Sequence, residues 1–191
     1  YVEGDETVIY ANFRGKDPRK EKVEINVRRE CFMPKKEHVD FITLSGFFVE
    51  KAATTWAPPA AFQDGMISPH WSYGWIIEDC EITNSKCCGI SLGKYYDDEN
   101  DNYFTRKHIK SPTQMERDAV CRGQYHGWLK EEIGSHTVRR CNIHDCQQTG
   151  IVGRMGCVFS TIEDNHIHHI NNMMELGGAE ISGIKLHAAI D

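Results

Sequence analysis

The chain has 191 residues, 40% of them hydrophobic, which is enough for a substantial core in one domain of ordinary size. Its 22 lysines and arginines are outnumbered by 28 aspartates and glutamates, giving a formal charge of −6, so no basic field exists to hold a nucleic-acid backbone or an anionic membrane. No apolar run approaches the roughly 18 residues of a membrane span, so we expect neither partner, and a neutral ligand fits better.

The first 31 residues alternate polar and apolar side chains as strands do, in "TVIYANF" and in "VEINVRREC". We expect residues 1–31 to form the earlier coils of the same domain. The chain begins at Tyr1 without a methionine and ends at Asp191 inside a patterned segment. We therefore expect residues 1–191 to be an excerpt of a longer protein.

One frame recurs along the chain: an apolar residue, a small or ring residue three positions later, and an apolar residue five positions later. Its four copies are Leu44, Phe47 and Val49; Ile77, Cys80 and Ile82; Val138, Cys141 and Ile143; and Ile162, Asn165 and Ile167. A glycine follows each copy and is expected to open a second short strand, at Gly65, Gly89, Gly150 and Gly183.

The spacing between each copy and its glycine predicts where loops enlarge the repeat. The last apolar residue precedes its glycine by 7 positions in the second and third copies, and by 16 in the first and fourth. Two copies therefore carry a longer loop at the same corner. A further insertion, at about residues 94–134, is expected to hold a polar loop and a short helix or two near residues 113–133.

Short β-branched strands, corner glycines and asparagines, and a period in the low twenties predict an all-β fold, a parallel β-helix solenoid. A leucine-rich repeat has a similar rhythm, but its strand positions are mostly leucine. All 191 residues are expected to belong to one such domain. Equivalent residues of successive coils stack about 4.8 Å apart, which places Cys80, Cys141 and Asn165 in one column.

The eight cysteines have three interpretations. We favour reduced thiols packed in the core, because the chain is long enough to fold without disulfides. Disulfides and a metal site remain the alternatives. Cys87 and Cys88 are adjacent and Cys141 and Cys146 are five apart, so neither pair has the spacing of a zinc site. This cysteine usage slightly favours a cytoplasmic location.

Alternation predicts a polar outer wall near the end of the chain. It points Ile184 and Leu186 inward, and Glu180, Lys185 and His187 outward. In the aligned frame Gln147 and Lys86 share the column of Glu180, Val152 and Ser91 share that of Lys185, and Arg154 lies beside His187. A wall of mixed charge between two long loops has the dimensions of a sugar-binding groove.

The first long loop and the residues after it offer Trp56, His70, Trp71 and Trp75. Aromatic faces beside hydrogen-bonding groups suit a carbohydrate, although tryptophans that only cover the core are the alternative. Glu180 has an alternative too, a carboxylate paired with Lys185.

Two segments carry side chains that could bind a metal ion. The histidines of "NHIHHI" allow a metal site, and the acidic "YYDDENDN" allows calcium. We expect no metal at the first, and a solvated loop rather than calcium at the second. No cofactor is expected.

Six segments resemble the glycoside hydrolase family 120 β-xylosidases, in order and over essentially the whole chain. They are "YANFRGKDP", "VEINVRRECFMP", "AATTWAPPAAFQDGMISPHWSYGWIIEDCEIT", "SKCCGISLGKY", "CQQTGIVGRMGCVFSTIEDNHIHHI" and "GAEISGIKLHAAID". The resemblance implies a right-handed parallel β-helix and an exo-acting enzyme that releases xylose from short xylo-oligosaccharides with retention at the anomeric carbon.

The resemblance also implies roles for individual residues. Glu180 matches a family glutamate that contacts the bound sugar, and Trp56, His70 and Trp71 would line the same pocket. The nucleophile and the acid/base of the family are expected beyond Asp191, so we expect no catalytic carboxylate within this chain and no activity from the fragment alone. A small oligosaccharide is the expected partner.

Two other functions remain open. A polysaccharide lyase would use the same architecture, but its acidic substrate demands more basic side chains than Lys86, Arg154 and Lys185 provide. A non-catalytic carbohydrate-binding solenoid is the other. The oligomeric state is not predicted.

Overall fold

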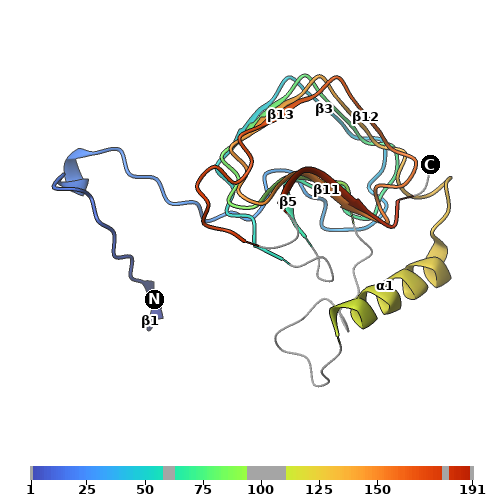
Figure 1. Ribbon diagram of the computed structural model, residues 1–191, viewed down its shortest axis with the longest axis horizontal. Coiled ribbons are helices and arrows are strands. Elements are labelled where there is room, and N and C mark those ends of the chain that lie inside the picture. Colours follow the sequence, from blue (N-terminus) through green and yellow to red (C-terminus); the bar gives the residue numbers. More distant parts are fainter. Residues whose placement is uncertain (1, 58–62, 94–110, 178–180, 190–191) are drawn as a thin grey trace.

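The computed structural model describes residues 2–57, 63–93, 111–177 and 181–189. Three four-stranded parallel sheets make up most of it, and each sheet takes one strand from each of four successive coils (Figure 1). The chain is mostly β and is consistent with the predicted solenoid. The helical part of the described chain holds no segment with the length and apolar character of a membrane span.

The strands fall into the three sheets in a repeating order. The first sheet contains β3 (Thr43–Ser45), β6 (Ile76–Glu78), β9 (Thr137–Arg139) and β12 (Thr161–Glu163). The second contains β4 (Phe48–Glu50), β7 (Glu81–Thr83), β10 (Asn142–His144) and β13 (His166–His168). The third contains β5 (Gly65–Ile67), β8 (Cys88–Ser91), β11 (Thr149–Arg154) and β14 (Ser182–His187).

The strand register confirms the repeat. The apolar positions that open the frame pair directly across the first sheet, and those that close it pair across the second. These columns are Leu44, Ile77, Val138 and Ile162, and Val49, Ile82, Ile143 and Ile167. Both columns point inward and form the core with Ile90 and Ile151 of the third sheet.

The glycine of the first copy is misaligned by one residue in the sequence frame. Gly65 pairs with Cys88, so Met66, and not Gly65, occupies the position of Gly89. The buried Met66 side chain fills the core at a place where the next coil has none. The sequence frame used the adjacent Gly65 in place of Met66. A shift of one residue along a strand moves every side chain to the opposite face.

Each coil turns twice at a residue with left-handed backbone conformation. The first corner uses Gly46, Asp79, Arg140 and Asp164, and the second uses Lys51, Asn84, Asp145 and His169, with φ between 50° and 73°. Glycine, asparagine and aspartate tolerate this region best. The fixed spacing of the sequence frame therefore reflects two regular corners.

The predicted stacking of Cys80, Cys141 and Asn165 is supported by backbone bonds. The amide of Asn142 donates to the carbonyl of Cys80 at 2.9 Å, and the amide of His166 donates to that of Cys141 at 2.9 Å. All eight cysteines are free, and six of them are buried. Burial raises the pKa of Cys146 and of Cys157 to about 12.

The remaining elements lie outside the coils. The helix α1 (Pro112–Gly127) falls within the predicted insertion and begins at Ser111, whose hydroxyl accepts from the amide of Gln114. At the other end, β1 (Val2–Glu3) and β2 (Glu6–Thr7) form a small hairpin, and a 3-10 turn spans Pro18–Lys20.

The expectation that residues 1–31 form coils is wrong for the described residues 8–30, which contain no strand. They extend away from the sheets (Figure 1). The apolar side chains of Val23, Ile25 and Val27 are exposed there and are not part of the core, although their spacing along the chain is that of a strand. The chain joins the third sheet at Cys31 and Phe32, whose amides both donate to the carbonyl of Met66, and Phe32 bridges to Ile67.

Candidate functional site

The outer wall is the outward face of the third sheet around Ser91, Val152, Arg154, Lys185 and His187. Val152 pairs with Ser91 on one side and with Lys185 on the other, and Arg154 pairs with His187. These pairs confirm the columns predicted from alternation. Parallel stacking thus brings residues from three coils onto one surface.

Most of this wall is buried, which corrects the expectation of an open polar groove. Ser91, Val152 and Arg154 are each no more than 3% exposed. Val152 packs with Cys87 and Cys88 in a small apolar cluster, against which Leu176 rests. The sequence pattern marks which side chains point outward, but not which loop then covers them.

The corner loop of the first coil provides part of this cover. The Thr54 hydroxyl accepts from the amide of Cys87 at 2.7 Å and lies 2.9 Å from the Ser85 hydroxyl. The Ser91 hydroxyl donates to the carbonyl of Gln63 at 2.7 Å. Gln148 donates to the carbonyl of Ala57 at 3.0 Å. The loop is therefore fastened to two further coils.

Lys185 and His187 lie on β14 at the end of the wall and are half-buried. Their neighbours Ile184 and Leu186 stand in the inward columns but are 46% and 39% exposed. Glu180, the glutamate matched by the resemblance, lies outside the described residues. Its column with Gln147 and Lys86 stays a prediction.

The backbone of His70 lies close to Gly93 of the next coil. Its φ is 64°, and its carbonyl oxygen approaches Gly93 so closely that a Cβ there would lie 2.1 Å away. Gly93 has a φ of 96°, so both steric space and conformation require glycine. Burial lowers the pKa of His70, while the carboxylates of Glu37 and Asp64 act in the opposite direction.

The tryptophans of the first loop differ in exposure. Trp56 is 41% exposed and presents a ring to solvent. Trp71 is 2% exposed and packs against Ile133 and Met155, and Trp75 is buried with its indole donating to the carbonyl of Val39 at 2.7 Å. Trp56 thus has a ring face available to a ligand, and its stacking on a sugar stays a prediction. The role of Trp71 in a pocket stays a prediction.

An ion pair between a buried carboxylate and an exposed guanidinium was not anticipated from the sequence. The Asp64 side chain is 2% exposed and contacts the guanidinium of Arg29. Burial raises the pKa of Asp64, and Arg29 opposes the shift. The residues are 35 positions apart, so no local motif reveals the pair. It ties the extended segment to the base of the first loop.

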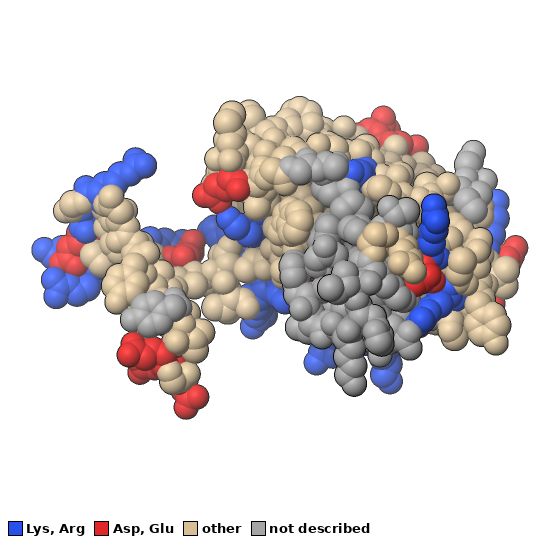
Figure 2. Space-filling model, turned by 60° about the horizontal axis from the view of Figure 1, so that its bottom comes forward, with Lys and Arg blue, Asp and Glu red and all other residues tan. Residues whose placement is uncertain are grey.

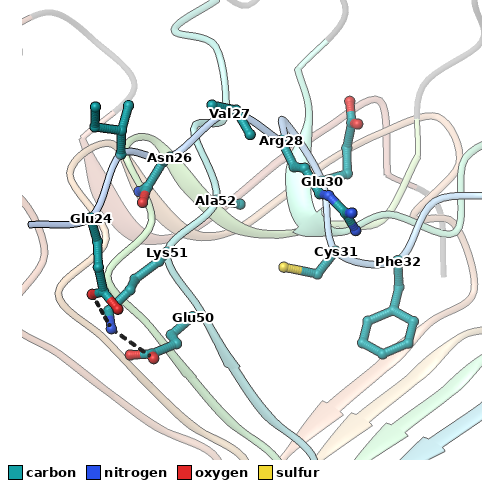
Figure 3. A pocket seen from close by; sticks show the side chains of 11 residues that line it. Glu24, Asn26, Val27, Arg28, Glu30, Cys31, Phe32, Glu50, Lys51 and Ala52 are labelled. Carbon is teal, nitrogen blue, oxygen red and sulfur yellow. Dashed lines mark ion pairs between the residues drawn. The ribbon is translucent and has the colours of Figure 1, made fainter.

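A cavity of about 570 Å³ lies between that extended segment and the corner after β4 (Figure 3). Lys51 bridges Glu24 and Glu50 at its edge, with nitrogen–oxygen distances of 2.9 Å to each. Contacts with Lys22 and with Lys51 lower the pKa of Glu24 to about 2. Among the predicted sugar-binding residues that the structure describes, none lines this cavity, so we do not assign the site to it.

A row of imidazoles crosses the outer face of the second sheet. The His144 and His168 rings stack with centroids 4.8 Å apart, and the His166 ring lies 4.2 Å from that of His168. Among the residues that the structure describes, no three His, Cys, Asp or Glu side chains are arranged to hold a metal ion. The acidic segment considered for calcium, residues 95–102, lies outside the described residues.

The described residues on one face of the molecule give no sign of a polyanion site. On the face seen in Figure 2, basic and acidic side chains are interspersed, and the described residues form no broad basic area there. The ion network of Glu78, Asp79, Arg139 and Arg140 shows the same mixture. There Arg139 and Arg140 both contact Glu78, at 2.7 Å and 3.0 Å.

This chain is similar to a solved structure over nearly its whole length. The structure is XylC in complex with xylose, which is 51% identical to this chain with a TM-score of 0.87. The match covers 94% of this chain and 28% of XylC, so the chain spans less than a third of that protein. No protein-family model matches, and no curated protein matches significantly.

Proposed function

We propose that this chain, which is similar to xylose-bound XylC, belongs to a xylosidase and forms the sugar-binding coils of a retaining β-xylosidase. The proposed fold is the right-handed parallel β-helix of family 120. The proposed reaction releases xylose from the end of a xylo-oligosaccharide. The observation that carries the proposal is 51% identity over nearly the whole chain to a protein whose structure holds that sugar.

We place the xylose at the open end of the outer wall. Lys185 and His187 are the wall residues with solvent access there. Glu180 precedes Lys185 by five positions in the sequence. Hydrogen-bonding side chains of this kind suit the hydroxyl groups of a pentose. Trp56 would supply an aromatic face for the C–H groups of the ring, and His70 a polar edge. Trp71 would line the pocket from beneath.

Retention requires two carboxyl groups about 5 to 5.5 Å apart. One attacks the anomeric carbon and forms a glycosyl-enzyme, and the other protonates the leaving oxygen and then activates water. By resemblance we propose that both belong to coils beyond Asp191. Glu180 is then a binding group, and the present residues orient the sugar for carboxylates supplied elsewhere.

Xylose titration tests the binding role by NMR or calorimetry. We expect saturable binding to the chain, and a loss of about tenfold or more in affinity for Glu180→Gln, because a hydrogen bond to a charged group contributes about 1.5–3 kcal/mol. Glu163→Gln is the matched control, since Glu163 is an exposed glutamate on β12 in another sheet. Equal affinity of the two variants would remove Glu180 from the site.

Hydrolysis of an aryl β-xyloside separates the possible functions. The whole enzyme should release xylose with retained configuration. Binding of xylose without hydrolysis by the whole enzyme would favour a non-catalytic sugar-binding solenoid. An unsaturated product from an acidic polysaccharide would favour a lyase. Hydrolysis by residues 1–191 alone would show that the catalytic carboxylates lie within them.

A further inference from the structure

The row of imidazoles on the second sheet joins the fourth coil to the third. His144 on β10 lies directly opposite His168 on β13, and their rings are nearly parallel, with an interplanar angle of 7°. His169 follows at the left-handed corner and touches His168. The seam defined by His144, His166, His168 and His169 is not used in the proposed sugar site.

The surroundings of His144 suit the doubly protonated ring. Its Nδ1 lies 2.5 Å from an oxygen of Asp145 and 3.2 Å from the Thr83 hydroxyl. Its Nε2 lies 3.3 Å from an oxygen of Glu81. Both nitrogens thus face carboxylates, and an imidazolium can donate to both at once. In agreement, the bonds to Asp145 and Glu81 raise the pKa of His144 against the effect of burial.

The surroundings of His168 suit the neutral ring. Its Nε2 lies 3.1 Å from the Asn142 side-chain oxygen, which accepts, so Nε2 carries the proton. Its Nδ1 lies 2.6 Å from Nδ1 of His169, so His168 accepts there and His169 donates. A second proton on His168 would turn two N–H groups toward each other across 2.6 Å. It would also place positive charge against His144 and His166.

We propose that this seam responds to pH. As the pH falls, His144 becomes doubly protonated first and donates to both Asp145 and Glu81. Protonation of His168 then separates β13 from β10. The groups facing His168 are His144, His166, His169 and Asp145, and only the last favours its protonation. Desolvation and these three rings lower the pKa of His168. Stability from the neutral ring is therefore full above pH 6.5 and falls as the pH drops through the folded-state value.

The sequence itself supplies matched substitutions. Thr83 occupies the column of His144 and His168 one coil earlier, so His144→Thr and His168→Thr insert a residue that this column already holds. Threonine also suits a strand. Both variants should fold at pH 8, which thermal unfolding checks.

Imidazole NMR titration of the chain from pH 8 to pH 4.5 tests the coupling. We expect His144 to titrate at higher pH than His168, and the His168 midpoint to rise in His144→Thr. Coincident midpoints in the unmodified chain, or an unchanged His168 midpoint in that variant, would overturn the proposal.

Hydrogen exchange of the His166 amide, which bonds to the carbonyl of Cys141, reports on the seam. The protection factor of this amide, corrected for its intrinsic exchange rate, should fall as the pH drops. The fall should be about tenfold for each pH unit between the pKa of His168 with the strands separated and its pKa with the strands paired. His168→Thr should retain its protection at low pH. Equal loss in both proteins would contradict the proposal.

Discussion

Replacing Gly150 with alanine probes how closely the coils are stacked. A Cβ at Gly150 would lie 2.6 Å from the carbonyl oxygen of Gly183 and 2.7 Å from Cγ2 of Ile167. The first distance is about 0.8 Å short of ordinary van der Waals contact, which begins at 3.4 Å. The oxygen belongs to the backbone of β14, so the whole coil must shift rather than one side chain.

Overpacking of this kind costs about 1–3 kcal/mol, and the lower entropy of unfolded alanine returns about 0.4–1 kcal/mol. We therefore expect a loss near 1–2 kcal/mol, which lowers the melting temperature of a chain of this length by roughly 2–8 °C. Thermal and denaturant unfolding measure it.

Gly183→Ala is the control within the same column. Among the described residues, a Cβ at Gly183 would meet only Cγ2 of Ile167, at an ordinary 3.7 Å, so we expect no loss and even a small gain in stability. Gly89→Ala should behave like Gly150→Ala, since its Cβ would lie 2.7 Å from the carbonyl oxygen of Gly150. If all three variants had the same melting temperature, the close stacking of coils would be refuted.

Three further predictions concern buried and exposed groups. Burial lowers the pKa of His136 from 6.5 to about 4. The free energy of unfolding should therefore fall by up to about 3 kcal/mol as the pH drops from 6.5 toward 4. Denaturant unfolding of His136→Asn should show a smaller dependence on pH. A thiol reagent should label the exposed Cys31 and Cys121 quickly, and the six buried cysteines only on unfolding; rapid labelling of more than two would contradict the packing. Glu78→Gln removes a partly buried ion pair with Arg139, so the melting temperature should fall slightly at low salt and by less at high salt.

The sequence predicted the coils well because their stacking imposes one residue type on each column. Ile77 and Val138 must both be apolar, since they share the core in paired strands. The error at Gly65 arose where the column has no fixed residue, because Met66 replaces glycine there. Pattern alone could not choose between two neighbouring positions.

The candidate site was less predictable, because it depends on contacts between segments distant in sequence. Lys185 and His187 were placed correctly by alternation. The burial of Ser91 under the first corner loop, and the pairing of Arg29 with Asp64, depend on loop paths that no period describes. Sequence reasoning therefore located the wall but not its cover.

The most direct test of the central claim is a titration of the folded chain with xylose, followed by NMR. The account predicts saturable shifts at the amides of β14, including Lys185 and His187, that weaken in Glu180→Gln and persist in Glu163→Gln. A folded chain that shows no saturable shifts with xylose, or equal shifts in both variants, would contradict it.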